Sequence, residues 1–185
     1  MRAMQMTDVQ ILLLPGLGNS GEDHWQTHWE RRFGYERVQQ DEWDTPSVKD
    51  WVSCLNSRIM INDSPKILVA HSLACCLVAH WSCVHTGPVI GALLVAPSDV
   101  EGPNYPQGPI GFSTMPMQRL PFPSMVVASS DDIYVSHGRG QLFSASWGSE
   151  YRLLESRGHI GSASRLGLWS EGQKLLEELI EKCDK

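Results

Sequence analysis

The chain has 185 residues, and 42% of them are hydrophobic, which suffices for one buried core and is too little for two ordinary domains. Its formal net charge of −6 excludes the basic surface that binds nucleic-acid phosphates or anionic lipids. We therefore expect a single domain over residues 1–185, a small-molecule substrate, and neither a nucleic-acid nor a membrane partner.

Six short runs with strand character alternate with helical stretches along the chain. They cover residues 9–14, 36–40, 66–70, 90–95, 125–128 and 151–154. Strands that alternate with helices are typical of a parallel sheet, and runs without polar alternation fit strands that are covered on both faces. The pattern predicts an α/β fold, a three-layer α/β/α sandwich with about six mainly parallel strands.

The helices expected between these runs have apolar faces. Trp25 and Trp29 lie one turn apart within residues 22–33, and residues 73–81 are apolar nearly all round, as in a helix buried against a sheet. Asp44-Thr45-Pro46 is interpreted as a capping residue and a helix-starting proline. An apolar stripe follows it, made of Val48, Trp51, Val52, Leu55 and Ile59. The last helix carries a second stripe, made of Leu175, Leu176, Leu179, Ile180 and Cys183.

The segment over residues 97–123 interrupts this alternation. It holds seven of the eleven prolines and has no helical or strand period, so it predicts an extended loop between the fourth and fifth strands. Long loops that leave a strand end are often functional. We expect this one to form a wall of a pocket beside Ser72.

The most informative stretch is Ala70-His71-Ser72-Leu73-Ala74, which places a serine between the third strand and the following helix. In the pattern Gly-x-Ser-x-Gly, a nucleophilic serine occupies such a corner, because small flanking residues let strand and helix crowd around it. Alanines replace both glycines here and keep the flanks small. Ser72 is therefore a candidate nucleophile.

A serine nucleophile needs a base and a carboxylate that orients the base. Active-site residues of parallel sheets gather at the carboxyl ends of strands. His159 follows the sixth strand and Asp132 the fifth, so we predict that they are the base and the acid. Asp131 and Asp99 are the alternative acids. The other six histidines lie next to Ser72, on helices or shortly after the acidic pair, and the side chain of His71 should point away from the site.

Two backbone amides are expected to bind the oxyanion. They belong to Leu73, the first residue of the helix after Ser72, and to Leu17 in the turn Pro15-Gly16-Leu17-Gly18-Asn19. Alternatively, that turn is only a connection between a strand and a helix. A dinucleotide site is a weaker alternative, with Gly21 as the third glycine and Asp41 as the ribose ligand.

The cysteines and the remaining histidines suggest no cofactor. Cys76, His80 and Cys83 share a helix face, but they are better explained as core residues of an apolar helix than as metal ligands. His24 and His28 lie one turn apart and are better explained as a partly exposed surface pair. Cys75 is interpreted as a core residue. An odd number of five cysteines favours reduced thiols in the cytoplasm. The first apolar run stops at Pro15-Gly16, too short for a membrane span, and we expect no targeting segment.

Several motifs together resemble one family, the small α/β-hydrolases of the retinoblastoma-binding-protein-nine and YdeN-like serine hydrolases. They are Leu14-Pro15-Gly16-Leu17-Gly18-Asn19-Ser20, Asp23-His24-Trp25-Gln26, Trp43-Asp44-Thr45-Pro46 with Asp50-Trp51-Val52, His71-Ser72-Leu73, Val95-Ala96-Pro97, Leu120-Pro121-Phe122-Pro123, Ala128-Ser129-Ser130-Asp131-Asp132, Gly158-His159-Ile160 and Gly167-Leu168-Trp169-Ser170-Glu171-Gly172. The resemblance spans nearly the whole chain.

This resemblance implies a compact α/β-hydrolase fold without a large cap domain, with Ser72 as nucleophile, Asp132 as acid and His159 as base. The chain departs from the family pattern at Ala70, Ala74 and Ile133, where glycines and a proline are usual. We expect His24 at the border of the pocket, although a polar contact at a helix start would explain it equally well. Gly16, Gly18 and His71 are further pocket candidates.

The expected activity is that of a serine esterase that cleaves a small acyl ester through an acyl-enzyme, without a cofactor. Amidase and thioesterase chemistry use the same triad and stay open. The competing hypothesis is a protein-binding module that keeps the hydrolase fold and has little turnover. Nothing in the sequence fixes the oligomeric state.

Overall fold

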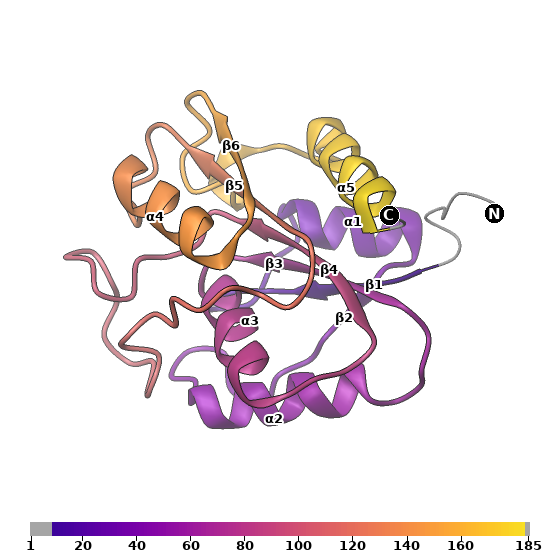
Figure 1. Ribbon diagram of the computed structural model, residues 1–185. Helices are drawn as coiled ribbons and strands as arrows, with labels where there is room; N and C mark the ends of the chain where they lie inside the picture. Colours follow the sequence, from indigo (N-terminus) through magenta and orange to yellow (C-terminus); the bar gives the residue numbers. More distant parts are fainter. Residues whose placement is uncertain (1–8, 184–185) are drawn as a thin grey trace.

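The computed structural model describes residues 9–183. Within them, six strands form one sheet in the order β2-β1-β3-β4-β5-β6 (Figure 1). All five strand pairings are parallel. The strands are β1 (Gln10–Leu14), β2 (Glu36–Arg37), β3 (Lys66–His71), β4 (Val89–Val95), β5 (Ser124–Ser129) and β6 (Glu150–Leu154). The sheet has β3 near its centre, and β2 and β6 are its two edges.

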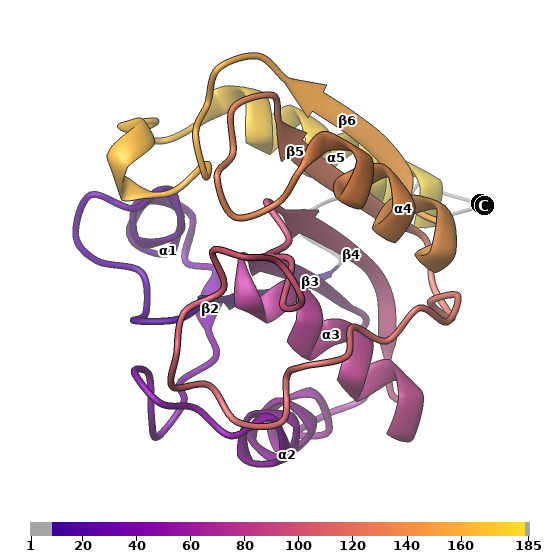
Figure 2. The ribbon, with the colours of Figure 1, turned by 90° about the vertical axis from the view of Figure 1, so that its left-hand side faces the viewer.

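Helices cover both faces of the sheet (Figure 2). They are α1 (Trp25–Phe33), α2 (Val48–Ile59), α3 (Leu73–Val84), α4 (His137–Trp147) and α5 (Ser170–Cys183). One buried cluster joins the sheet to α2, α3 and α4, and a second cluster joins it to α1 and α5. The predicted three-layer α/β/α sandwich is therefore confirmed.

Strand β1 shows why its run is apolar throughout. Leu12 and Leu14 belong to the cluster with α2 and α3, whereas Ile11 and Leu13 belong to the cluster with α1 and α5. Successive side chains of a strand point to opposite faces, so both sets must be apolar when helices cover both faces.

Several predicted boundaries were wrong. Strand β2 ends at Arg37 rather than Gln40, since it lies at the edge of the sheet. Helix α1 begins at Trp25 rather than Glu22, because the Nδ1 atom of His24 accepts a hydrogen bond from the Gln26 amide and caps the helix. Helix α2 begins after Ser47 rather than at the predicted Asp44 cap, and Ser47 makes no side-chain capping bond.

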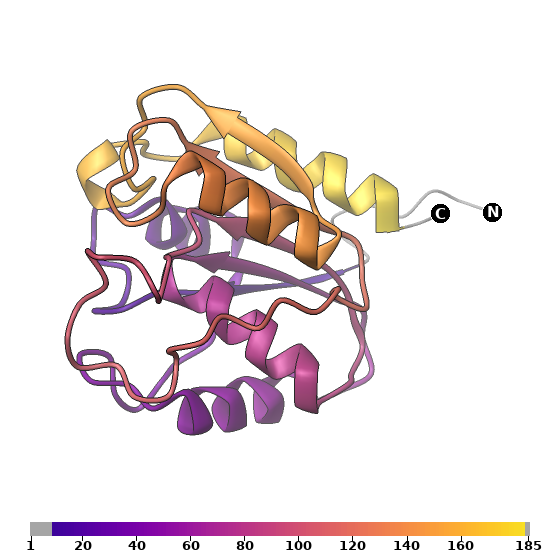
Figure 3. The ribbon, with the colours of Figure 1, turned by 60° about the vertical axis from the view of Figure 1, so that its left-hand side comes forward.

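The segment between β4 and β5 is irregular, as predicted, and runs along α3 (Figure 3). Its apolar residues Phe112, Met115, Leu120 and Phe122 are buried in the cluster with α2 and α3. Helix α4 has no apolar stripe that sequence analysis could single out, because Gly140 and Ser144 make up half of its buried face. Within residues 9–183, none of the helices has the length and apolarity that crossing a membrane requires.

Candidate active site

Ser72 occupies a strained turn between β3 and α3, the elbow. Its φ of 59° and ψ of −122° are unusual for a residue with a side chain. The Ser72 amide donates a hydrogen bond to the Val95 carbonyl at 2.9 Å, which ties the turn to β4. Ala70 and Ala74, the small residues on either side of Ser72, are fully buried.

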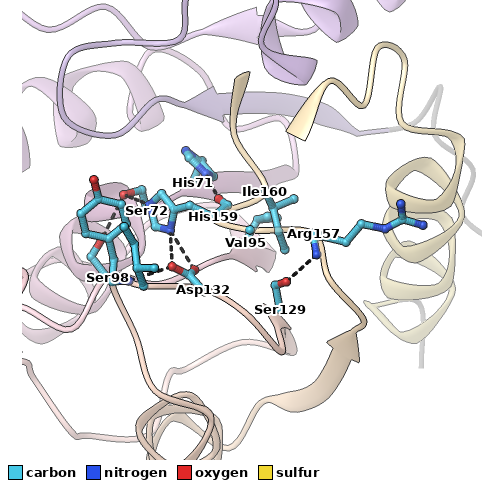
Figure 4. A network of polar contacts seen from close by, with 12 residues as sticks. His71, Ser72, Val95, Ser98, Ser129, Asp132, Arg157, His159 and Ile160 are labelled. Carbon is cyan, nitrogen blue, oxygen red and sulfur yellow. Dashed lines mark hydrogen bonds and ion pairs between the residues drawn. The ribbon is translucent and has the colours of Figure 1, made fainter. Parts of the chain in front are cut away.

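The structure brings Ser72, His159 and Asp132 together from the loops after β3, β6 and β5 (Figure 4). The Nε2 atom of His159 lies 2.7 Å from the Ser72 Oγ atom. On the other side of the ring, Nδ1 lies 2.8 Å from Oδ2 and 3.0 Å from Oδ1 of Asp132. The Asp132 side chain is fully buried. A carboxylate can only accept, so this geometry favours a proton on Nδ1 and leaves Nε2 to accept from the serine hydroxyl.

The two alternative acids face other groups. Asp131 Oδ1 accepts from the Ser129 hydroxyl at 2.8 Å and from the Gly158 amide at 2.7 Å, and these hydrogen bonds lower the pKa of the Asp131 carboxyl. Asp131 thus connects the loop after β5 to the segment that carries the histidine. Asp99 forms a bidentate ion pair with Arg139, at 2.8 Å for both contacts.

His71 lies behind the candidate base and holds its backbone. Its Nε2 atom is 2.9 Å from the His159 carbonyl oxygen. Burial holds the pKa of the His71 imidazole well below its usual range, and the nearby His24 and His159 add to the shift, so the neutral ring donates through Nε2. The Trp25 indole donates to the next carbonyl, that of Ile160, at 2.8 Å. Both side chains thereby fix the turn that presents His159.

A cavity of about 230 Å³ opens beside Ser72. Its walls are Leu17, Ser72, Leu73, Ser98, Tyr105, Pro106, Tyr134 and His159. Three of these residues come from the segment over 97–123, in agreement with the wall predicted there. No charged carboxylate, lysine or arginine is among the wall residues.

Four predicted pocket residues are not part of these walls. His24 and His71 are buried behind the base, where their ring centroids lie 4.7 Å apart. Gly18 has a φ of 74°, and its amide donates to the Trp43 carbonyl. Gly16 packs against the elbow itself, because a Cβ atom at this position would lie 2.8 Å from the His71 carbonyl oxygen and 2.9 Å from the Ser72 Cβ atom. The structure thus places these four residues behind or beside the cavity walls.

Sequence reasoning missed two residues at the site. Ser98 places its Oγ atom 2.8 Å from the Ser72 Oγ atom, and the Tyr134 ring lies 4.6 Å from the His159 ring, centroid to centroid. Ser98 follows β4 and so lies at the carboxyl ends of the strands, where the other candidates also lie. This position was the signal in the sequence that could have identified it. Leu17 and Leu73, the predicted oxyanion donors, both lie at the cavity beside Ser72.

The candidate metal ligands do not gather. Among residues 9–183 there is no group of three or more histidine, cysteine or acidic side chains that could hold a metal ion. Cys75 and Cys76 are fully buried, and burial raises the pKa of both thiols. They are core residues of α3, as expected.

Comparisons with known proteins concern the family and the fold. A family model described as serine hydrolase matches residues 11–178. A structure described as a YdeN-like hydrolase from Pectobacterium atrosepticum is 29% identical, with a TM-score of 0.85 over 97% of this chain and 94% of that chain. No curated protein matches the chain.

Two more distant structures share the fold. The ydeN gene product of B. subtilis is 17% identical, with a TM-score of 0.68 over 92% of this chain and 97% of that chain. The monoacylglycerol lipase of Paleococcus ferrophilus is 12% identical, with a TM-score of 0.71 over 94% of each chain. At such identities the likeness concerns the architecture alone.

Proposed function

The chain belongs to the serine hydrolase family, and from this premise we propose that it hydrolyses small acyl esters with Ser72 as nucleophile, His159 as base and Asp132 as acid. One observation carries the proposal. The Ser72 Oγ atom, the two ring nitrogens of His159 and the Asp132 carboxylate form a continuous hydrogen-bonded line with contacts of 2.7 and 2.8 Å. Nucleophile, base and orienting carboxylate need this order.

In the proposed reaction, His159 Nε2 takes the proton of the Ser72 hydroxyl while Oγ attacks the ester carbon. Asp132 stabilises the imidazolium that forms, and the Leu17 and Leu73 amides stabilise the oxyanion. The tetrahedral intermediate collapses to an acyl-enzyme, and the alcohol leaves with the proton from His159. Water, activated by the same histidine, then releases the acid. A single oxyanion donor of this kind typically contributes about 10²–10³ in rate.

The cavity supports a neutral and short acyl group. Its volume of about 230 Å³ is below the range of roughly 300–1,000 Å³ that is common for drug-sized ligands. Leu17, Leu73 and Pro106 give it apolar side chains, and its polar side chains carry only hydroxyls and one imidazole. A charged acyl group would lose its hydration there without gaining a partner.

Ser72, His159 and Asp132 could also cleave amides and thioesters, so the preferred leaving group needs its own test. We propose esters as the main substrates and expect 4-nitrophenyl acetate and butyrate to react faster than the decanoate. A panel of chain lengths, with matched thioesters and anilides, measures this order by kcat/KM. A preference for the long chain or for the anilide would contradict the proposed substrate class.

The decisive experiment is labelling with a fluorophosphonate, followed by mass spectrometry of the modified peptide. We expect label on Ser72 and loss of both label and ester hydrolysis in Ser72→Ala. Ser82→Ala is the matched control, because its hydroxyl bonds only to the Ala79 carbonyl in the same helix, α3. Absence of label on Ser72 in the folded protein would refute the proposal.

All five cysteines are unpaired. This supports the additional proposal that the enzyme works in a reducing compartment, the cytoplasm. Fractionation of the cells that produce the protein would test it, and recovery outside the cytoplasmic fraction would contradict it.

A further inference from the structure

The candidate nucleophile has a second partner that the triad does not account for. Ser72 Oγ lies 2.8 Å from Ser98 Oγ as well as 2.7 Å from His159 Nε2 (Figure 4). Ser98 is only 7% exposed, yet its side chain is part of the cavity wall. Its hydroxyl therefore lies where the ester bond forms and breaks.

Counting protons fixes the direction of this hydrogen bond. In the state ready to react, His159 is neutral with its proton on Nδ1, facing Asp132, so Nε2 accepts from the Ser72 hydroxyl. A serine hydroxyl has one proton to donate, and Ser72 donates its proton to His159 Nε2. The contact between the two serines must then be donated by Ser98 to the Ser72 oxygen.

We propose that Ser98 is a further catalytic residue, one that donates a hydrogen bond to Ser72 Oγ and chiefly assists the release of the acyl group. This inference rests on the proposed serine hydrolase function. When water has added to the acyl-enzyme, the bond between the acyl carbon and Oγ breaks and its electron pair moves to Oγ. His159 donates to Oγ the proton that it took from water, which restores the Ser72 hydroxyl, and the free acid leaves.

The donated hydrogen bond stabilises negative charge on Oγ while that bond breaks. Before the first attack, the free Ser72 hydroxyl already accepts this hydrogen bond, so the starting state is stabilised as well and little of the bond's effect is left for the barrier. In the acyl-enzyme, Oγ is an ester oxygen and a weaker acceptor, so the bond strengthens mainly while Oγ leaves. Ser98 should therefore speed deacylation more than acylation. One neutral hydrogen bond corresponds to a factor of about three to ten in rate.

The neighbouring residues explain how Ser98 is held. The Asp99 amide donates to the Tyr134 carbonyl at 3.0 Å, and the Asp99 carboxylate accepts from Nε and Nη2 of Arg139, both at 2.8 Å. Arg139 also contacts Glu101 at 2.7 Å. These contacts fix the backbone next to Ser98 against the loop that follows β5, which also carries the acid of the triad.

Stopped-flow hydrolysis of 4-nitrophenyl acetate tests the proposal, with the Ser72→Ala background subtracted. In Ser98→Ala we expect steady-state turnover to fall about three- to tenfold and the nitrophenol burst to rise toward one per active site. The rate constants of the burst and of fluorophosphonate labelling should stay within about twofold of wild type. Ser98→Cys keeps the shape of the side chain and replaces the hydroxyl with a weak donor, and it should behave like Ser98→Ala.

Three results would overturn the role of Ser98. They are unchanged turnover in Ser98→Ala, an equal fall of burst and steady-state rates, and wild-type turnover in Ser98→Cys. The last would show that side-chain volume matters rather than donation. A wild-type protein with neither burst nor label would instead refute the hydrolase proposal, and this inference with it. Wild-type turnover with any of the three results leaves the hydrolase proposal intact.

Discussion

At Gly16 the backbone after β1 passes so close to the elbow that a side chain has no space. A Cβ atom there would meet the His71 carbonyl oxygen at 2.8 Å and the Ser72 Cβ atom at 2.9 Å. Real Cβ atoms do not approach that closely, so the turn or the elbow must move. Leu17, a proposed oxyanion donor, is the next residue and would move with it.

We predict that Gly16→Ala lowers kcat/KM for 4-nitrophenyl acetate by about 10²-fold, because a shift of about 1 Å at a catalytic group has this effect. Overpacking should also lower the free energy of unfolding, measured in urea, by about 1–3 kcal/mol. Gly21→Ala is the control in the same segment, since a Cβ atom there meets nothing within 4 Å. Equal activities of the two variants would contradict the importance of this contact.

Asp132 and its neighbour Asp131 offer a second comparison at the residue scale. Asp132→Asn keeps the size of the side chain but removes the charge that stabilises the imidazolium and lets the wrong tautomer form. We expect kcat to fall by about 10³–10⁴. Asp131→Asn retains an oxygen that can accept from Ser129 and Gly158, so its kcat should stay within about tenfold of wild type. Steady-state kinetics would refute the assignment of the acid if Asp131→Asn were the slower variant.

Between elements, the ion pair of Asp99 with Arg139 fastens the segment after β4 to α4. The side chains are 10% and 29% exposed, so the pair is largely shielded from water. Met is the suitable replacement for Arg139, because it keeps an apolar stem over the Phe143 ring, whose centroid lies 4.8 Å from the guanidinium carbon.

Arg139→Met should lower the free energy of unfolding by about 2–3 kcal/mol, since it leaves the Asp99 carboxylate buried without its partner. Urea denaturation measures this. Adding Asp99→Asn should recover part of the loss, and the double-mutant cycle gives the coupling. Arg152→Met is the control: Arg152 pairs with Glu150 and Glu178 at 40% exposure, so its loss should stay within about 0.5 kcal/mol. Equal losses for both arginines would show that the inner pair is no stronger than a surface one.

On the scale of the whole molecule, buried neutral histidines make stability depend on pH. Burial, followed by the charges of Arg37, His159 and His28, lowers the pKa of His24 from 6.5 to about 3. Below pH 6.5 the unfolded chain binds a proton that the folded chain does not, so stability is fully present above that pH and is lost as the pH falls toward 3. Burial also lowers the pKa of the His71 imidazole.

We expect His24→Asn to make this dependence shallower. Asn is also a good helix N-cap, so it can replace the bond to the Gln26 amide. Between pH 7 and pH 5, His24 alone should account for about 2 kcal/mol of the lost free energy of unfolding. Urea midpoints at the two pH values, for wild type and variant, measure the difference. Parallel losses in both proteins would contradict the role of His24.

The sequence predicted the architecture because the apolar pattern of each strand depends on whether helices cover one or both of its faces. Ile11 to Leu14 are all apolar since helices cover both faces of β1, and that pattern is local. The starts of α1 and α2 depend instead on which of several polar residues meets the first amides. At α1 the His24 side chain accepts from the Gln26 amide, although histidine is not a preferred cap, and at α2 Ser47 precedes the first helical residue without a side-chain capping bond.

The candidate site was predictable where it follows from strand ends. Ser72, Asp132 and His159 come after β3, β5 and β6, and a parallel sheet places those ends side by side. Ser98 also follows a strand end, that of β4, but nothing in the strand pattern shows that its hydroxyl meets Ser72 or that the Tyr134 ring meets His159, because these contacts join distant segments. Strand patterns carry no information about such contacts.

The position of β6 at the edge of the sheet has a consequence for how the protein loses activity. This strand pairs only with β5 and is half-buried, yet the segment after it carries His159. An outer strand can detach while the inner ones stay paired, because local opening needs less free energy than global unfolding. We expect mild urea to abolish ester hydrolysis before the far-UV circular dichroism signal falls. Coincident transitions would show that β6 opens only with the whole sheet. If activity is lost first, opening of β6 alone is a reversible inactive state of an otherwise native fold.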